Sequence, residues 1–322
     1  GIKYLVLAAS SAAFLLFGMA LIYMATGTMS FAALSHALLT SRSPLLLPGA
    51  ALILVGIGFK LGLVPFHLWT PDVYQGAPAP VGAFIATASK AGVFAVLLRL
   101  YLDMGNPDAP RAVVVITVLA IGSMAAGNLL ALRQRNLKRL LASSSIAHRG
   151  YLLVAFEAAV ASPALAEAAV GFYFLAYFIT TLGAFGVISA GATQDGEPEM
   201  LDDYRGLFWR RPALALVLTL MMFSLAGIPL TAGFIAKFYL VDAGVSAALW
   251  LMLLTLVITS VVGLFYYLRV VVTLYATDEE IRLSAPLVRT DAWVLGALTV
   301  ALIWVGVYPQ TFLRLILGLR LR

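Results

Sequence analysis

The sequence has no cysteine, only three histidines, and few charged residues, which make up 11% of its 322 positions. The absence of cysteine excludes disulfides, thiolate-bound iron–sulfur clusters and cysteine zinc sites within this chain. The histidines lack metal-ligand spacing, so no metal site is predicted. No G-x-G-x-x-G motif follows a strand, and no Ser-His-Asp set is indicated. The formal net charge of +6 does not predict nucleic-acid binding, because in so apolar a chain the location of charge matters more than its sum.

Hydrophobic residues are abundant instead: they form 62% of the chain, and the mean hydropathy is +0.99. Soluble domains are about 45–50% apolar and about 25% charged. A helix that crosses a bilayer needs roughly 20 apolar residues. Runs of that length predict an all-α polytopic membrane protein with about nine transmembrane spans, at 3–26, 46–69, 80–102, 111–132, 138–160, 165–191, 212–241, 247–275 and 292–317.

Basic residues follow every second predicted span: in RQRNLKR at 133–139, and at Arg205, Arg210, Arg211, Arg269, Arg282 and Arg289. The loops predicted at 103–110, 157–164 and 242–246 contain no Lys or Arg. Cytoplasmic loops of membrane proteins carry an excess of Lys and Arg. The basic loops, together with the Lys3 end, are therefore predicted to face the cytoplasm, although the basic C-terminal tail runs against this rule.

Three lysines, Lys60, Lys90 and Lys237, lie inside apolar runs, where an ammonium near the bilayer centre costs about 2.5–3.5 kcal/mol. Pro65 follows the first of them and Pro229 precedes the last. A proline removes one backbone N–H and frees a carbonyl, which a membrane tolerates only where water or polar groups reach it. We therefore predict helix breaks at both prolines, in a hydrated interior where the lysines exchange protons. The alternative is that such a lysine snorkels to the interface or caps a broken helix.

The sequence offers these lysines no counter-ion. No Asp or Glu precedes Asp72, and none is predicted at the depth of the three lysines. A buried ammonium without a partner charge is costly. We therefore expect a carboxylate to come from a segment that precedes Gly1 or from another subunit.

Other polar residues are secondary candidates. His148 is a candidate proton relay, because imidazole titrates near neutrality, or else a packing residue bonded to a backbone carbonyl. His67, beside Trp69, is favoured as an interfacial anchor, and His36 as a solvated loop residue. Arg149, in mid-span, is predicted to face a hydrated cavity or a protein partner rather than lipid, because a charge in lipid is expensive. Possible auxiliary members of a proton path are His67, Ser144, Ser145 and Thr231.

Four stretches carry a family resemblance: FKLGLVPFHLWTPDVYQGAPAPVGAFIATASKAGVF, NLLALRQRNLKRLLASSSIAHRGYLL, DYRGLFWRRP and LAGIPLTAGFIAKFYL. They closely resemble the antiporter-like membrane chains of bacterial respiratory complex I, chain N in particular, the counterpart of mitochondrial subunit 2. The resemblance implies an antiporter-like fold with inverted repeats and discontinuous helices, in which this chain matches helices six to fourteen of fourteen. Residues 1–110 would end the first repeat, 111–276 would form the second, and 277–322 the final helix and tail.

The resemblance also implies a function, proton translocation by a membrane subunit of NADH:quinone oxidoreductase in the bacterial inner membrane. Lys60, Lys90 and Lys237 would form part of a polar axis through the membrane, and the glutamate paired with the first would lie on a preceding helix. Partners would be the other membrane subunits of complex I. FMN, iron–sulfur clusters and quinone are expected in partner subunits, and no cofactor in this chain. The alternatives are a cation/proton antiporter or hydrogenase membrane subunit of the same superfamily, or a non-pumping scaffold.

Two positions depart from the pattern of that family. The family usually has an aromatic residue before the serine pair and an apolar residue after the histidine. Here Ser143 precedes Ser144 and Ser145, and Arg149 follows His148. The role of Arg149 is therefore not given by the resemblance.

Overall fold

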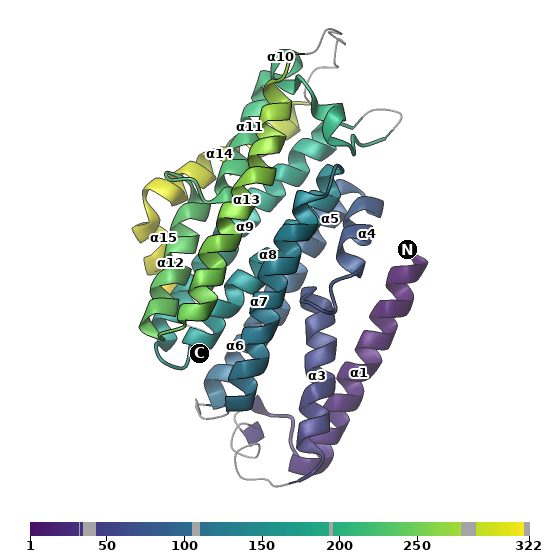
Figure 1. Cartoon of the computed structure of the whole chain (residues 1–322), viewed down its shortest axis with the longest axis vertical. Coiled ribbons are helices and arrows are strands. Elements are labelled where there is room, and N and C mark those ends of the chain that lie inside the picture. The colour runs from purple at the N-terminus through teal and green to yellow at the C-terminus, as the bar shows by residue number, and fades with distance from the viewer. Residues whose placement is uncertain (32, 35–42, 105–109, 193–195, 278–287, 319–322) are drawn as a thin grey trace.

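A computed structural model describes residues 1–322 apart from 32, 35–42, 105–109, 193–195, 278–287 and 319–322 (Figure 1). Its regular elements are helices, and Asn136 and Met200 form an isolated antiparallel bridge. In chain order the helices are α1 (Ile2–Thr26), α3 (Leu46–Leu61), α4 (Trp69–Gly76), α5 (Ala79–Ala86), α6 (Ala88–Met104), α7 (Pro110–Leu132), α8 (Leu137–Ala158), α9 (Pro163–Ala190), the short 3₁₀ helix η1 (Leu201–Tyr204), α10 (Leu207–Arg210), α11 (Pro212–Ala226), α12 (Ala232–Ser246), α13 (Trp250–Tyr275), α14 (Arg289–Val307) and α15 (Pro309–Gly318).

Six helical segments in the described residues are long and apolar enough to cross a membrane, by length and composition. They lie in α1, α5–α6, α7, α9, α13 and α14. The broken pairs α3–α4 and α11–α12 and the more charged α8 cover the other predicted spans, so a total of nine stays a prediction. The expectation of one continuous last span at 292–317 is wrong. Helix α14 ends at Val307, and Pro309 begins α15, because proline suits the first turn of a new helix.

Both predicted helix breaks are present and are built alike. Gly62 caps the C-terminal end of α3 and Gly227 caps that of α11, each with a positive φ, +72° and +84°. The N–H two positions after each helix bonds back five residues, Leu63 to the Gly58 carbonyl and Ile228 to the Phe223 carbonyl, both at 2.9 Å. This is the glycine-ended Schellman turn, whose left-handed residue costs glycine little. Pro65 and Pro229 follow these turns, so the prediction from the prolines is confirmed.

A third break was not predicted. The expected span at 80–102 is interrupted at Thr87, where φ is −111° and ψ is −89°. The Lys90 N–H bonds to the Thr87 carbonyl rather than to that of Ala86, so the Ala86 carbonyl is released from the helix. The Thr87 hydroxyl donates to the Ala83 carbonyl at 2.7 Å. Such back-bonding by threonine often bends helices. The break has no glycine or proline at Thr87 that would have predicted it from the sequence.

The two broken helices run in opposite directions. In Figure 1, α4 lies above α3 whereas α12 lies below α11. This agrees with the predicted inversion of two repeats, although the boundaries of those repeats stay a prediction.

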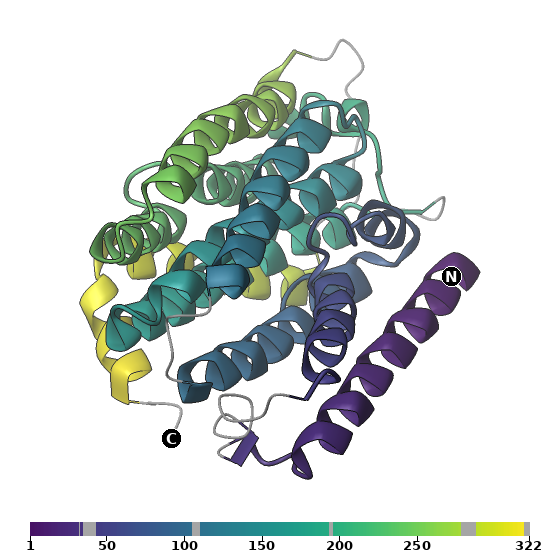
Figure 2. The ribbon, with the colours of Figure 1, turned by 60° about the horizontal axis from the view of Figure 1, so that its bottom comes forward.

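Helix α8 lies at the centre of the bundle, with every residue buried except Arg139. It packs on α4, α7, α9 and α12. Its approach to α7 is close because glycine stands at the crossing: a Cβ on Gly150 would lie 2.7 Å from the Ala120 carbonyl oxygen. Helix α1, by contrast, lies at the outer edge of the bundle against α3 (Figure 2). Side chains on the inner faces of α8 are therefore enclosed by protein.

A polar clasp joins the start of α8 to α4, α5 and the segment before η1. Glu197 forms an ion pair with Lys138 and accepts the Ala79 N–H at 2.8 Å. Glu199 Oε2 accepts hydrogen bonds from Gln75 and Asn136, each at 2.9 Å. The clasp fixes α5, and hence the Thr87 break, against α8.

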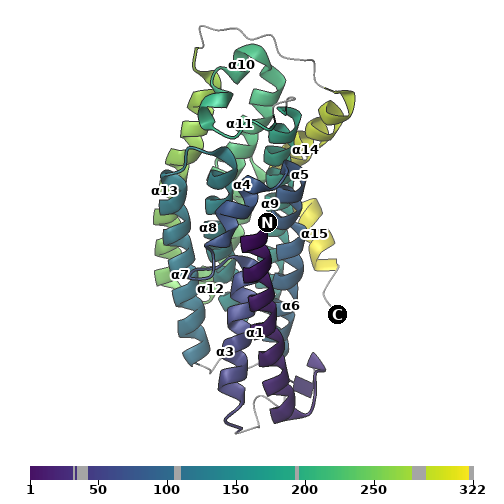
Figure 3. The same cartoon turned by 90° about the vertical axis from the view of Figure 1, so that its right-hand side faces the viewer.

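The basic loops share this end of the bundle. Arg269 of α13 donates to the carbonyls of Leu132 and Gln134, and the Gly206 N–H donates to the Thr273 carbonyl. In Figure 3, α10 lies at the same end, above α4 and α8. This agrees with the prediction that the basic segments at 133–139 and around Arg205, Arg210 and Arg211 lie on one side. Most of the basic segment that contains Arg282 lies outside the described residues, and the assignment of this side to the cytoplasm stays a prediction.

Replacing Glu197 with alanine should lower the stability of the fold. The change leaves the Lys138 ammonium, only 4% exposed, without its carboxylate and the Ala79 N–H without an acceptor. Removing one partner of a buried ion pair costs on the order of 3 kcal/mol. Thermal unfolding in detergent should show a lower midpoint for Glu197→Ala, whereas Asp202→Ala, an exposed acid of the same segment, should unfold as the wild type does. Equal midpoints for the two variants would show that the clasp contributes nothing.

Candidate functional site

Lys237 occupies the second turn of α12, just after the break. Its Nζ donates to the Ala226 carbonyl at 2.8 Å, at the point where α11 ends. It also lies 5.5 Å from the centre of the Tyr151 ring of α8. Gly227 makes room for the lysine, because a Cβ there would come within 2.9 Å of Lys237 Cδ. The break thus supplies both the freed carbonyl and the space that hold this ammonium.

His148 is buried on α8 between two phenols. Its Nδ1 lies 2.5 Å from the Tyr173 hydroxyl, and its Nε2 lies 3.0 Å from the Tyr267 hydroxyl. A neutral imidazole donates from one nitrogen and accepts at the other. The alternative of a packing histidine bonded to a backbone carbonyl does not describe this geometry, because both ring nitrogens face side-chain hydroxyls that can donate or accept.

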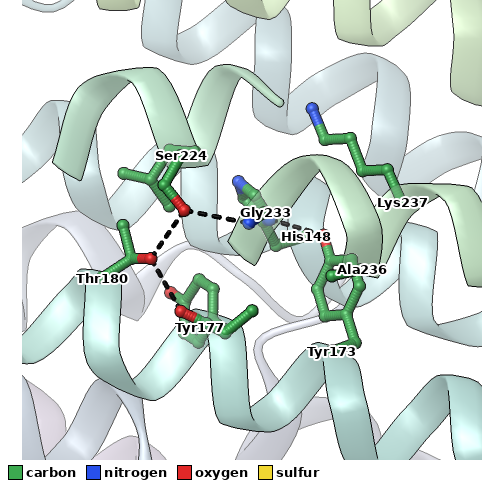
Figure 4. A pocket seen from close by; sticks show the side chains of 10 residues that line it. His148, Tyr173, Tyr177, Thr180, Ser224, Gly233, Ala236 and Lys237 are labelled. Atoms are coloured by element: carbon green, nitrogen blue, oxygen red, sulfur yellow. Dashed lines mark hydrogen bonds between the residues drawn. The ribbon is translucent and has the colours of Figure 1, made fainter. Parts of the chain in front are cut away.

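Lys237 and His148 line the same small cavity (Figure 4). Its volume is about 10 Å³, close to the space that one water molecule requires. Ser224 Oγ accepts the Gly233 N–H at 3.1 Å and lies 3.0 Å from the Thr180 hydroxyl. The remaining lining residues are Tyr173, Ala176, Tyr177, Leu225 and Ala236. An ammonium and an imidazole, two groups whose chemistry allows proton exchange, therefore meet at one small cavity beside the second break.

A second set of buried polar side chains lies between the same two groups. Tyr266 donates to Asn128 Oδ1 at 2.9 Å, and Asn128 Nδ2 donates to the Tyr151 hydroxyl at 3.0 Å. The Tyr266 and Tyr267 rings are 4.4 Å apart. This set extends from Tyr267, the hydroxyl partner of His148, to Tyr151, whose ring contacts Lys237. The sequence prediction missed it, because tyrosines in apolar spans look like packing residues, and only Asn128 offered a signal.

Lys90 is buried, with 1% of its surface exposed, beside the first break. Its Nζ lies 5.4 Å from the Trp69 ring centre and 5.3 Å from that of Tyr74, both on α4. The described residues offer it no hydrogen-bond acceptor. A Cβ on Gly62 would lie 3.5 Å from this Nζ, so the turn that ends α3 borders the ammonium. Lys90 is thus an interior group, as predicted, but it is held by aromatic faces.

Arg149 joins the two lysine environments. Its Nη2 donates at 2.8 Å to the Ala86 carbonyl, which the Thr87 break releases. Its guanidinium stacks 4.6 Å from the Tyr177 ring, and that ring contacts His148 at 5.3 Å between centroids. The prediction that Arg149 faces protein rather than lipid is confirmed. It caps a freed carbonyl, as Lys237 does.

Lys60 has no contact with this interior set among the described residues, so its place on one axis with the other lysines stays a prediction. It lies in the last turn of α3, and its side chain is exposed. Helix α3 is apolar on all sides. Its sequence pattern therefore did not show which face would be covered.

The auxiliary candidates have varied roles. Ser144 bonds within its own helix to the Leu141 carbonyl, and Ser145 is buried without a hydrogen-bond partner among the described residues. Thr231 donates to the Ile228 carbonyl at 2.7 Å and so closes the second break. His67 is buried in the segment between α3 and α4, and its expected role as an interfacial anchor stays a prediction. His36 lies outside the described residues.

No group of three or more His, Asp or Glu side chains that could hold a metal gathers in the part of the chain that the structure describes. The chemistry of the site is that of ammonium, imidazole, phenol and hydroxyl groups. Such a set can bind, pass and release protons.

Comparison with known proteins identifies one family of membrane proteins to which the chain is similar. Residues 1–263 match the family described as NADH:quinone oxidoreductase/Mrp antiporter, transmembrane. A curated protein of Ectopseudomonas mendocina (strain ymp), named NADH-quinone oxidoreductase subunit N, is 53% identical over 98% of this chain and 65% of its own length. The chain thus spans less than two thirds of that relative.

Two solved structures resemble the fold. A chain of respiratory complex I from Thermus thermophilus, determined with bound aureothin, is 38% identical, with a TM-score of 0.81 over 97% of this chain and 67% of that one. A chain of the membrane-bound sulfane sulfur reductase, an archaeal respiratory membrane complex, is 29% identical, with a TM-score of 0.85 over 98% of this chain and 64% of that one.

Proposed function

Because this chain belongs to the NADH:quinone oxidoreductase/Mrp antiporter family of membrane proteins, we propose that it is a proton-translocating subunit of an NADH:quinone oxidoreductase. The observation that carries the proposal is the meeting of Lys237 and His148 at one cavity beside a helix break. Water reaches a membrane interior where helices are interrupted. The 53% identity to a subunit N favours this function over that of a cation/proton antiporter or a scaffold.

The proton steps follow from the contacts. Lys237 is held through one N–H by the Ala226 carbonyl, and its ammonium has two further N–H groups that can donate. His148 takes up a proton at one ring nitrogen and gives one up at the other, while the Tyr173 and Tyr267 hydroxyls rotate to donate or accept. Arg149 places its guanidinium next to this site, against the Tyr177 ring. Lys90 is the next proton-binding group toward the first break.

Lys60 enters the proposal differently. Its exposed ammonium in an apolar span requires a cover that carries negative charge, because lipid stabilises it poorly. We assign that cover to a carboxylate of another segment or of a neighbouring membrane subunit. The redox groups, FMN, iron–sulfur clusters and quinone, would belong to partner subunits, and the location would be the bacterial inner membrane.

The proposal predicts what accompanies the chain. Affinity purification from native membranes should recover NADH-oxidising partner chains, identified by mass spectrometry. Vesicles that contain the complex should acidify when NADH and quinone are supplied, and an uncoupler should abolish the gradient. Recovery with antiporter chains alone, together with sodium–proton exchange that needs no NADH, would support the antiporter function instead.

A further inference from the structure

Glu157 is a buried carboxylate that the site described above does not use. The sequence placed it in a loop at 157–164, whereas the structure places it in the last turn of α8, with 6% of its surface exposed. Both of its oxygens accept from the Thr117 hydroxyl of α7, at 3.2 and 3.0 Å. The same hydroxyl lies 3.9 Å from Met252 Sδ of α13. Glu157 is therefore enclosed where α7, α8 and α13 meet.

Its position is unusual for a packing residue. Among the buried residues that the structure describes, Glu157 is the one carboxylate, and no described basic side chain pairs with it. A carboxylate offers about four acceptor sites, and here one hydroxyl serves two of its oxygens. It also stands at the C-terminal end of a helix, where the dipole opposes negative charge. Glutamine or methionine would fill this space at lower cost, so the acid itself calls for an explanation.

Glu157 lies beyond the lysine cavity, toward the end of the bundle away from the basic loops. Tyr151, whose ring lies beneath Lys237, is six residues earlier on α8, which corresponds to about 9 Å along the helix. A Cβ on Gly244 of α12 would lie 2.9 Å from Val154, so α12 accompanies α8 toward this end. The clasp at Asn136 occupies the opposite end of α8.

Helix α13 gives the same spacing independently. Thr259 of α13 interacts with the Tyr151 phenol, and Met252 lies beside Thr117. The two α13 residues are seven positions apart, or about 10 Å. Two helices thus place Glu157 about 10 Å along the bundle from Tyr151, whose ring contacts Lys237.

We propose that Glu157 is the proton-release group of this chain: it accepts a proton that leaves the Lys237–His148 cavity and discharges it at the end away from the basic loops. The inference rests on the proposed function. The proton adds to a carboxylate oxygen to give a carboxylic acid that still holds Thr117, and its loss to solvent restores the carboxylate. No electron moves, and no other reactant is consumed.

Glu157→Gln tests the inference in the assembled complex, because glutamine keeps the size and the bond to Thr117 but cannot carry a proton. We expect NADH-driven pumping in vesicles to be largely lost, while the complex assembles normally. Glu157→Asp should recover part of the pumping. Asp242→Asn, which removes an exposed carboxylate from α12, should pump as the wild type does. Wild-type pumping by Glu157→Gln would overturn the inference.

Infrared difference spectra separate proton transfer from a merely structural role. Turnover should produce a carboxyl carbonyl band that disappears in Glu157→Gln and shifts in Thr117→Val, because valine removes the hydroxyl bond. If Glu157→Gln does not assemble, the Thr117→Val spectrum alone decides, and an unshifted band overturns the inference. Lys237→Ala runs in parallel. If Lys237→Ala stops pumping and Glu157→Gln does not, the inference about Glu157 is wrong and the proposed function still stands. If neither variant stops pumping, both the inference and the proposed function are wrong.

Discussion

Proton pumping should be lost almost completely when Lys237 is replaced by alanine in the assembled complex. The change removes the ammonium that shares a cavity with His148 and leaves the Ala226 carbonyl at the break without its donor. The measurement is the rate of proton pumping by inverted membrane vesicles, recorded together with the rate of NADH-driven quinone reduction. The control is Phe238→Ala, an exposed neighbour on α12 that should leave both rates unchanged.

Lys237→Arg distinguishes charge from proton exchange. Arginine can still donate to the Ala226 carbonyl, but a guanidinium releases its proton far less readily than an ammonium does. We therefore expect Lys237→Arg to assemble like the wild type and yet to fail in pumping. Pumping at the wild-type rate by both variants would show that the path runs elsewhere and that this chain acts as a scaffold.

The second large effect should come from two glycines around the second break. A Cβ on Gly233 would overlap the Ser224 carbonyl oxygen. A Cβ on Gly306 of α14 would lie 2.6 Å from both the Leu230 carbonyl oxygen and the Thr231 carbonyl carbon. These neighbours are backbone atoms, which cannot rotate away as a side chain does. Overpacking typically costs about 1–3 kcal/mol of folding free energy. We expect each alanine variant to lose about 3 kcal/mol or more, at the upper end of that range.

The yield of monodisperse protein after detergent extraction and the thermal midpoint both report this loss. Gly296→Ala is the matched control on α14, because a Cβ there meets nothing within 4 Å. We expect Gly296→Ala to equal or exceed wild-type stability, since alanine favours helix over glycine. Wild-type midpoints for Gly233→Ala and Gly306→Ala would mean that the break is looser than the structure shows.

Local chemistry made part of this protein predictable. Apolar length specifies a membrane helix, because a bilayer imposes a fixed thickness. Pro65 and Pro229 specify breaks, because proline removes a backbone donor wherever it stands. The mid-span charge of Arg149 predicted an enclosed position for the same kind of reason. Each of these predictions depends on the residue and its immediate neighbours alone.

Tertiary contacts decided the rest of the site. The spans are apolar on nearly every side. The hydrophobic periodicity therefore could not show that Lys60 lies on an exposed face and Lys90 in the interior. The phenols that hold His148 come from α9 and α13, 25 and 119 positions away, and Glu157 meets its hydroxyl 40 positions away. The break at Thr87 needs Arg149 from α8 to satisfy its carbonyl. The sequence alone determined a membrane protein with broken helices and buried cations, because those features follow from backbone donors and bilayer thickness. Only the packing of distant helices decided which cations share a cavity, because contact across helices depends on their rotation and crossing.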